Sequence, residues 1–207
     1  GGVAHIVEPL TPRSLDEPMT AYGLLADAVA YPDDFSYAIY GLHPAARWHD
    51  GKPVTPEDVI FSFDAFKTNS PMYNAYYRHI VKCEKIADGQ VKFTFDAPGN
   101  RELPSIAGEV PVLPKHWWEG TDAQGRKRDV TATTLEIPLG SGPYRIKEFT
   151  AGRNLVLERF ADYWGASIPV RVGTNNFAEI RYDFFRDETV ALEAFKGDQF
   201  DWVREAS

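Results

Sequence analysis

Pairs of adjacent carboxyl side chains, such as Asp16-Glu17, Asp33-Asp34 and Glu57-Asp58, are the first candidates for chemistry. A hydrolase of the glycosidase kind holds two carboxyl groups across a cleft at a defined separation, which adjacent positions do not provide. Helix caps and solvated turns explain such pairs better, because acidic side chains are favoured in the first turn of a helix. We therefore predict no enzyme, and a carboxylate-dependent hydrolase stays an alternative hypothesis.

The other side chains with catalytic or metal-binding chemistry are dispersed. The histidines are His5, His43, His49, His79 and His116. None forms an H-E-x-x-H motif or another close pair at ligand spacing, and Cys83 is the sole cysteine, so we predict no metal site, no cofactor and no internal disulfide. Ser141 lies in Gly-Ser-Gly, which falls short of the G-x-S-x-G nucleophile elbow, and we interpret it as a turn that enters a strand.

The charge balance argues against binding to nucleic acid. The 207 residues carry 22 Lys and Arg against 30 Asp and Glu, a formal net charge of -8. Neutralising phosphates requires clustered basic residues, and the short basic run 126–128 is better explained as a solvated loop. With 43% hydrophobic residues the chain can bury a sizeable core in one or two domains, and no apolar run is long enough to predict a membrane span.

The segment that must position these side chains most firmly is 47–66, which reads RWHDGKPVTPEDVIFSFDAF. Asp50-Gly51 is a turn dipeptide, since glycine reaches positive φ without a steric penalty. Thr55 can cap a helix, and Pro56 suits its first position. The buried face of that helix would carry Val59, Ile60, Phe63 and Phe66. Upstream, residues 35–42 place Phe35, Tyr37 and Ile39 on one side of a predicted strand.

The remaining segments alternate between short helices and strands. We expect the end of a helix in residues 1–7, an irregular segment or short helix in 24–29, and a second helix within 68–80. A half-buried strand with Val91, Phe93 and Phe95 on its inner face follows. The prolines at 104, 111 and 114 break the next stretch into short pieces.

From residue 138 onward we expect a hairpin around 150–152, a strand in 178–185, a helix from Asp187 to Gly197 and a further strand in 198–203. The predicted class is a mixed α/β fold.

Two segments together resemble a known family. LHPAARWHDGKPVTPEDVIFSFDAF and, further along the chain, GSGPYRIKEFTAGRNLVLERFADYWG resemble the paired motifs of extracellular solute-binding protein family 5, and RSLDEP resembles its YejA-like branch. The resemblance implies a periplasmic binding protein of type II, present in part. Residues 1–137 would be the middle domain, with 1–7 ending a preceding helix, and 138–207 would be a returning, incomplete part of the first lobe.

The resemblance also implies a function. Proteins of this family are oligopeptide-binding components of ABC importers, so we expect a monomer that captures oligopeptides in the periplasm and delivers them to a membrane permease. A ligand-sensing domain of the same fold in a regulator is an alternative.

The ligand contacts implied by the resemblance lie at two places. Met72 and Tyr73 align with a segment in which an aromatic side chain reaches the peptide pocket. Trp202, Arg204 and Glu205 lie at or just after the end of the last predicted strand, which could face the cleft. The 47–66 corner itself is expected to be scaffold that does not touch the ligand.

Overall fold

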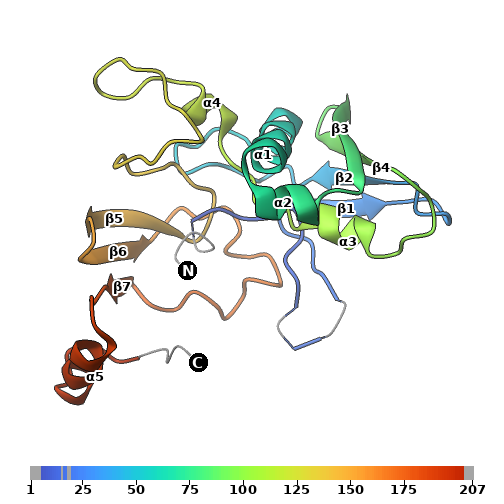
Figure 1. Ribbon diagram of the computed structural model, residues 1–207. Helices are drawn as coiled ribbons and strands as arrows, with labels where there is room; N and C mark the ends of the chain where they lie inside the picture. Colours follow the sequence, from blue (N-terminus) through green and yellow to red (C-terminus); the bar gives the residue numbers. More distant parts are fainter. Residues whose placement is uncertain (1–5, 15, 18–19, 203–207) are drawn as a thin grey trace.

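Two antiparallel sheets organise the chain, as the computed structural model shows for residues 6–14, 16–17 and 20–202 (Figure 1). The first sheet has the strand order β1-β2-β4-β3, and the second has the order β5-β6-β7. Helices accompany both sheets, so the predicted mixed α/β class is confirmed.

The first sheet is built from β1 (Ala26–Ala30), β2 (Tyr37–Leu42), β3 (Ile80–Ala87) and β4 (Gln90–Phe95). In β4, Val91, Phe93 and Phe95 are all buried, which confirms the face predicted for this strand. No element had been predicted for β3. Its polar sequence does not indicate a strand, and it forms one because its backbone pairs with β4 in antiparallel orientation.

Two predictions for this sheet need correction. Residues 24–29 belong largely to β1 and form no helix, because pairing with β2 satisfies their backbone groups. In β2 the buried side chains are Ala38 and Tyr40, so the face marked by Tyr37 and Ile39 is the less buried one. Phe35 lies before the strand with a positive φ of 54°.

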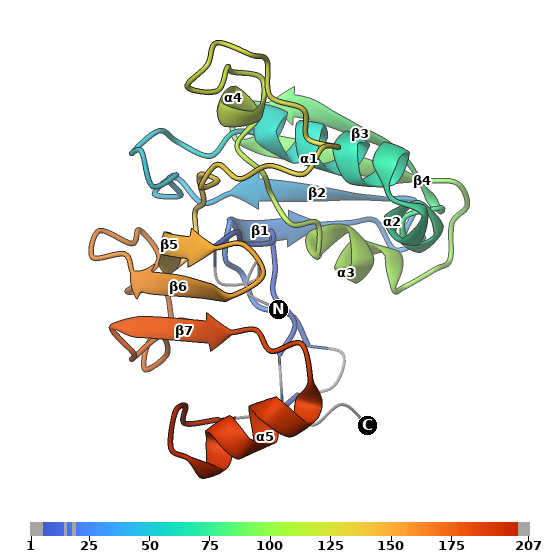
Figure 2. The same cartoon turned by 60° about the vertical axis from the view of Figure 1, so that its left-hand side comes forward.

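The predicted corner leads into α1 (Pro56–Asn69) as expected. Gly51 adopts a positive φ of 84°, the left-handed conformation that a side chain would strain. The Thr55 hydroxyl accepts a hydrogen bond from the Asp58 amide at 3.4 Å, and the Asp58 carboxylate accepts one from the Thr55 amide at 2.8 Å. This capping box fixes the start of the helix, which lies over the first sheet (Figure 2). Its buried residues Val59 and Phe63 belong to the same hydrophobic core as the sheet residues Val91 and Phe93.

Three short helices complete this part of the chain. They are α2 (Pro71–Tyr76), α3 (Leu103–Gly108) and α4 (Lys115–Trp118). The helix predicted within 68–80 is therefore confirmed, as are the short pieces expected around the prolines.

The second sheet consists of β5 (Tyr144–Thr150), β6 (Asn154–Arg159) and β7 (Glu179–Asp183), followed by α5 (Glu188–Lys196). The predicted hairpin, strand and helix are confirmed. The strand predicted in 198–203 is wrong for its described part, since residues 198–202 form bends that fold back on α5. Asp198 has a φ of 54°, which turns the chain away from an extended course.

The amino-terminal segment joins the two sheets. Residues 6 and 7 form a turn and a bend, so the helix predicted there is wrong for these two residues, and residues 1–5 lie outside the described part. The carbonyl oxygen of Ile6 accepts hydrogen bonds from the amides of Ser141 at 3.0 Å and Gly142 at 2.8 Å. Ile6 and Val7 thus pack in the hydrophobic cluster of the second sheet, beside Tyr144.

No helix in the described ranges is both long enough and apolar enough to cross a bilayer.

Candidate functional site

The polar side chains of the 47–55 motif form hydrogen bonds with nearby residues of the same chain. Trp48 is 1% exposed, and its indole Nε1 donates to Asp58 at 3.4 Å. The Arg47 guanidinium donates to the carbonyl oxygen of Pro44 at 2.7 Å, and His116 lies 2.9 Å from the Asp50 carboxylate. These contacts lie within the chain and support the interpretation of the corner as scaffold.

His49 connects this motif to the second one. Its Nε2 donates to the carbonyl oxygen of Gly142 at 2.8 Å, its amide donates to Gly140, and its ring packs on Phe160 at a centroid distance of 4.5 Å. Burial lowers the pKa of His49, so the ring is held in its neutral form. The two motifs that are far apart in the sequence therefore form one structural unit.

The acidic pairs serve turns and caps. Asp34 accepts from the Ser36 amide at 3.0 Å, Glu57 pairs with Lys85 at 3.1 Å, and Asp58 caps α1. Asp16 accepts from the Ser14 hydroxyl at 2.7 Å. Among the residues that the structure describes, no three His, Cys, Asp or Glu side chains gather as metal ligands would. Nothing in this geometry favours the hydrolase hypothesis.

The predicted contact residues on α2 differ in accessibility. Met72 is 67% exposed at the first turn of the helix. Tyr73 is partly buried, with its ring between Phe66 at 4.7 Å and Tyr77 at 5.6 Å between centroids. Tyr73 therefore packs on the core in this structure, whereas Met72 is open to a partner.

The second predicted group lies elsewhere on the molecule. Trp202 is 72% exposed just beyond α5, and Arg204 and Glu205 lie outside the described residues. Both views place α5 at the far side of the second sheet, away from α2 (Figures 1 and 2). The structure does not bring Trp202 together with Met72 and Tyr73, and their role in binding stays a prediction.

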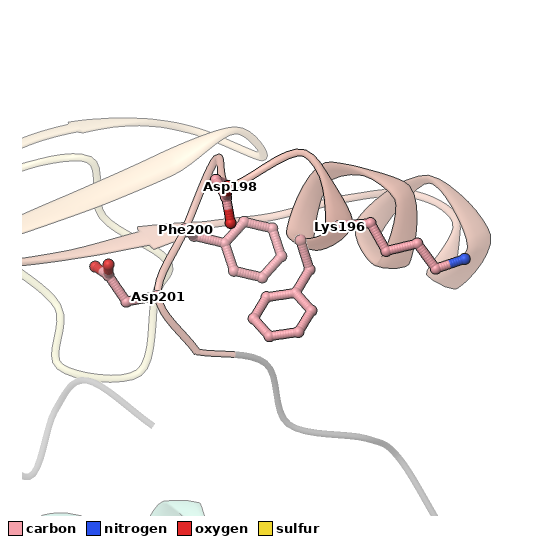
Figure 3. A pocket seen from close by; sticks show the side chains of 5 residues that line it. Lys196, Asp198, Phe200 and Asp201 are labelled. Carbon is pink, nitrogen blue, oxygen red and sulfur yellow. The ribbon is translucent and has the colours of Figure 1, made fainter.

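A hollow of about 480 Å³ opens at the carboxyl end of α5, and one of its lining residues is Asp201, which directly precedes Trp202 in the chain (Figure 3). Its lining residues are Phe195, Lys196, Asp198, Phe200 and Asp201. The local sequence produces it in three steps. The Asp187 carboxylate caps α5 by accepting from the Thr189 amide at 2.6 Å, the helix ends at Gly197, and the turn at Asp198 brings Phe200 back over the helix.

The rings of Phe195 and Phe200 form the aromatic floor of this hollow. Phe200 packs between Phe195 at 5.6 Å and Phe185 at 5.7 Å, measured between ring centroids. Phe185 and Phe195 keep more than a third of their surface exposed, an unusual state for large apolar side chains in a group. The floor can therefore accept an apolar group.

The rim of the hollow is acidic. The Lys196 amine pairs with Glu193 at 2.7 Å and points along the helix (Figure 3). Asp198 and Asp201 make no ion pair with any residue that the structure describes. An aromatic floor beside two carboxylates suits a ligand that combines an apolar side chain with a cationic group.

Sequence reasoning missed most of this site. It singled out Trp202 but assigned its neighbours to a strand, and strand alternation would place Phe200 and Asp201 on opposite faces. The signal was present in FKGDQFDW, where a glycine after a helix precedes a second aromatic residue.

A second hollow, of about 490 Å³, lies along the outer side of α1 near α4. It is lined by Glu57, Ile60, Phe61, Asp64, Ala65, Thr68, Asn69, Lys115, Glu119 and Val130. It contains neither a predicted contact residue nor a cluster of aromatic rings, so the hollow beside α5 is the stronger candidate.

Comparison with known families decides the wider assignment. The family model described as "Bacterial extracellular solute-binding proteins, family 5 Middle" matches residues 20–207. The chain belongs to this family. The resemblance inferred from the two motifs is thereby confirmed.

Family 5 relatives match over nearly the whole chain. A protein of Agrobacterium fabrum named "Probable peptide-binding protein YejA" is 46% identical over 206 residues, which are 100% of this chain and 34% of that protein. A second protein of the same organism, named "Peptidoglycan-binding protein YepA", is 42% identical over 95% of this chain and 31% of its own length. The chain thus spans about a third of the length of these relatives.

Solved structures agree with this assignment. The crystal structure of "a putative peptide binding protein AppA from Clostridium difficile" is 27% identical, with a TM-score of 0.72, over 94% of this chain and 38% of that protein. The fold is that of part of a type II periplasmic binding protein, as predicted.

Proposed function

We propose that this chain is part of a periplasmic binding protein that captures oligopeptides and delivers them to the membrane permease of an ABC importer. The observation that carries the proposal is the family 5 match over residues 20–207, together with a relative named as a probable peptide-binding protein at 46% identity. The protein would act by binding, without catalysis, and as a monomer. Peptide binding would shift it from an open to a closed form that the permease recognises.

Within this proposal the hollow beside α5 contributes to the peptide site. Its aromatic floor would receive an apolar side chain, and Asp198 and Asp201 would receive the amino terminus or a basic side chain. Trp202 follows the lining residue Asp201 in the chain, is exposed, and would extend the apolar contact. We further propose that residues 1–137 form the middle domain and that 138–207 belong to the first lobe.

The test is to measure peptide capture by the complete gene product. The protein would be unfolded to remove carried ligand, refolded and mixed with a pool of short synthetic peptides, and retained peptides would be identified by mass spectrometry after gel filtration. Selective retention of peptides supports the proposal. Failure to retain any peptide contradicts it.

A second ligand class is suggested by the relative named as peptidoglycan-binding. The same experiment would include purified peptidoglycan fragments that carry short peptides. Retention of these fragments, with rejection of ordinary peptides, would move the proposal from general oligopeptides to peptides of the cell wall. Transport into vesicles that carry a candidate ABC permease would then test delivery.

A further inference from the structure

Glu8 is a completely buried acid at the junction of the two sheets. Its side chain is 0% exposed, and its backbone carbonyl accepts from Val112 on the side of the first sheet. Its carboxylate oxygen Oε1 accepts hydrogen bonds from the Tyr163 hydroxyl at 2.5 Å and from Nη2 of Arg171 at 2.9 Å. Both partners belong to the 160–178 loop, which connects β6 to β7. Three side chains thus tie this loop to the amino-terminal segment.

The ion pair between Glu8 and Arg171 lacks one of the two hydrogen bonds that such a pair can form. Arginine and a carboxylate often pair through two parallel hydrogen bonds, but here only one is formed. Glu8 Oε2 and Arg171 Nε are both buried and find no hydrogen-bond partner among the described residues. A buried ion pair compensates for its lost hydration only when its polar atoms are satisfied, so this carboxyl group is poorly stabilised as an anion.

Burial of the Glu8 carboxyl group points the same way, and its two polar neighbours oppose this effect only in part. The ionisable groups of the described residues that act on the Glu8 carboxyl are Tyr163 and Arg171. Burial raises the pKa of Glu8 to about 7, although the Tyr163 hydrogen bond and the Arg171 charge partly oppose this. A carboxyl group whose pKa is raised in the folded protein stabilises the fold fully when the pH is below the group's ordinary pKa of 4.5. That contribution is lost as the pH rises through the folded pKa of about 7.

We propose that Glu8, Tyr163 and Arg171 form a protonation-controlled clasp that holds the 160–178 loop against the amino-terminal segment at low pH and loosens it at higher pH. The loop leads directly into β7 and α5, which support the hollow. The clasp rests on these three side chains alone and does not depend on the proposed peptide ligand.

The first experiment measures the titration of Glu8 directly. In protein labelled with carbon-13 at the glutamate carboxyl group, the NMR signal that disappears in Glu8→Gln belongs to Glu8. We expect its midpoint near pH 7, and a further rise in Tyr163→Phe, which removes a hydrogen bond to the anion. A midpoint near the ordinary value of 4.5 would overturn the proposal.

The second experiment measures opening of the loop. Hydrogen exchange at the amides of Ile168 and Arg171, corrected for intrinsic rates, reports the opening equilibrium of the clasp. Between about pH 5 and about pH 8 the opening constant should rise on the order of 50-fold in the unmodified protein. In Glu8→Gln it should change only a few-fold, because glutamine imitates the neutral acid. An equal rise in both proteins would refute the clasp. If Glu8→Gln does not fold, Glu8 is identified as the glutamate whose midpoint moves in Tyr163→Phe, and the rise of the opening constant must extend to the same higher pH in that variant.

Discussion

The imidazole of His49 donates a hydrogen bond of 2.8 Å to the carbonyl oxygen of Gly142, 93 positions further along the chain. The two residues belong to the two segments that carry the sequence resemblance to family 5, RWHDGKP and GSGPY. The bond holds the entrance of β5 against the turn that precedes α1. The two segments that resemble the family therefore meet at a structural junction, while the candidate ligand contacts lie elsewhere.

Replacing His49 tests the importance of this junction. His49→Ala removes a partly buried hydrogen bond and the ring contact with Phe160, so we expect the free energy of unfolding to fall by about 1–3 kcal/mol. Chemical denaturation of the variant measures this change. The matched control is His79→Ala, because His79 lies at the surface beside Asp96 and should contribute little. Equal losses in the two variants would contradict a special role for His49.

The same histidine predicts a dependence of stability on pH. Burial lowers the pKa of His49, so the unfolded chain binds a proton more readily than the folded one. Stability should therefore fall as the pH drops below the ordinary value of 6.5 toward the lower folded pKa. His49→Gln keeps a donor without the titration, so the difference between the two unfolding curves isolates the histidine. The sign is opposite to that of Glu8, and a difference that grows toward higher pH would refute the prediction.

Gly140 is expected to tolerate no side chain. A Cβ there would lie inside contact distance of the Ile6 carbonyl oxygen and its Cγ2, and the backbone of Ile6 cannot move without breaking its bonds to Ser141 and Gly142. Gly140→Ala should lower the free energy of unfolding by about 1–3 kcal/mol. Gly41→Ala is the control, since its Cβ would meet Ala28 at an ordinary 3.5 Å. Thermal melting of both variants checks the comparison, and unchanged stability of Gly140→Ala would show that the junction is looser than described.

Asp58 stabilises the first sheet's helix and the loop before α4 together. Its carboxylate is 3% exposed and accepts from the amides of Thr55 and Lys115, both at 2.8 Å. Asp58→Asn would turn one acceptor into a donor facing these amides, so we expect a loss of about 2–4 kcal/mol. Glu57→Gln, which alters only an exposed pair with Lys85, should leave the denaturation midpoint nearly unchanged. A small effect of Asp58→Asn would count against this account of the corner.

The sequence predicted those parts of the fold that local chemistry determines. Thr55, Pro56 and Gly51 specify a capped helix after a turn whatever surrounds them, and Val91, Phe93 and Phe95 alternate strictly in β4. The prediction from sequence failed where pairing with a neighbouring strand determines the conformation of a segment. The Ala-rich segment of β1 has no strand pattern of its own, and its conformation comes from its antiparallel partner β2.

The candidate site was less accessible to sequence reasoning. Exposed Trp202 could be singled out as a large aromatic residue, but the hollow beside it depends on the left-handed turn at Asp198. That turn places Phe200 on Phe195, five positions earlier, a contact that no strand pattern contains. Glu8 was also missed, because its partners Tyr163 and Arg171 lie more than a hundred residues away.

Calorimetric titration of the complete gene product with a retained peptide tests the central claim most directly. Phe200→Ala and Asp201→Asn remove the aromatic floor and one rim carboxylate of the hollow, while Arg126→Ala alters a surface loop elsewhere. If the hollow contacts the peptide, each of the first two variants should weaken binding by about tenfold or more, or about 1.4 kcal/mol, with unchanged melting curves, and Arg126→Ala should bind like the unmodified protein. Equal affinity in all four proteins would contradict a role for the hollow, and the absence of peptide binding in the unmodified protein would contradict the proposed function itself.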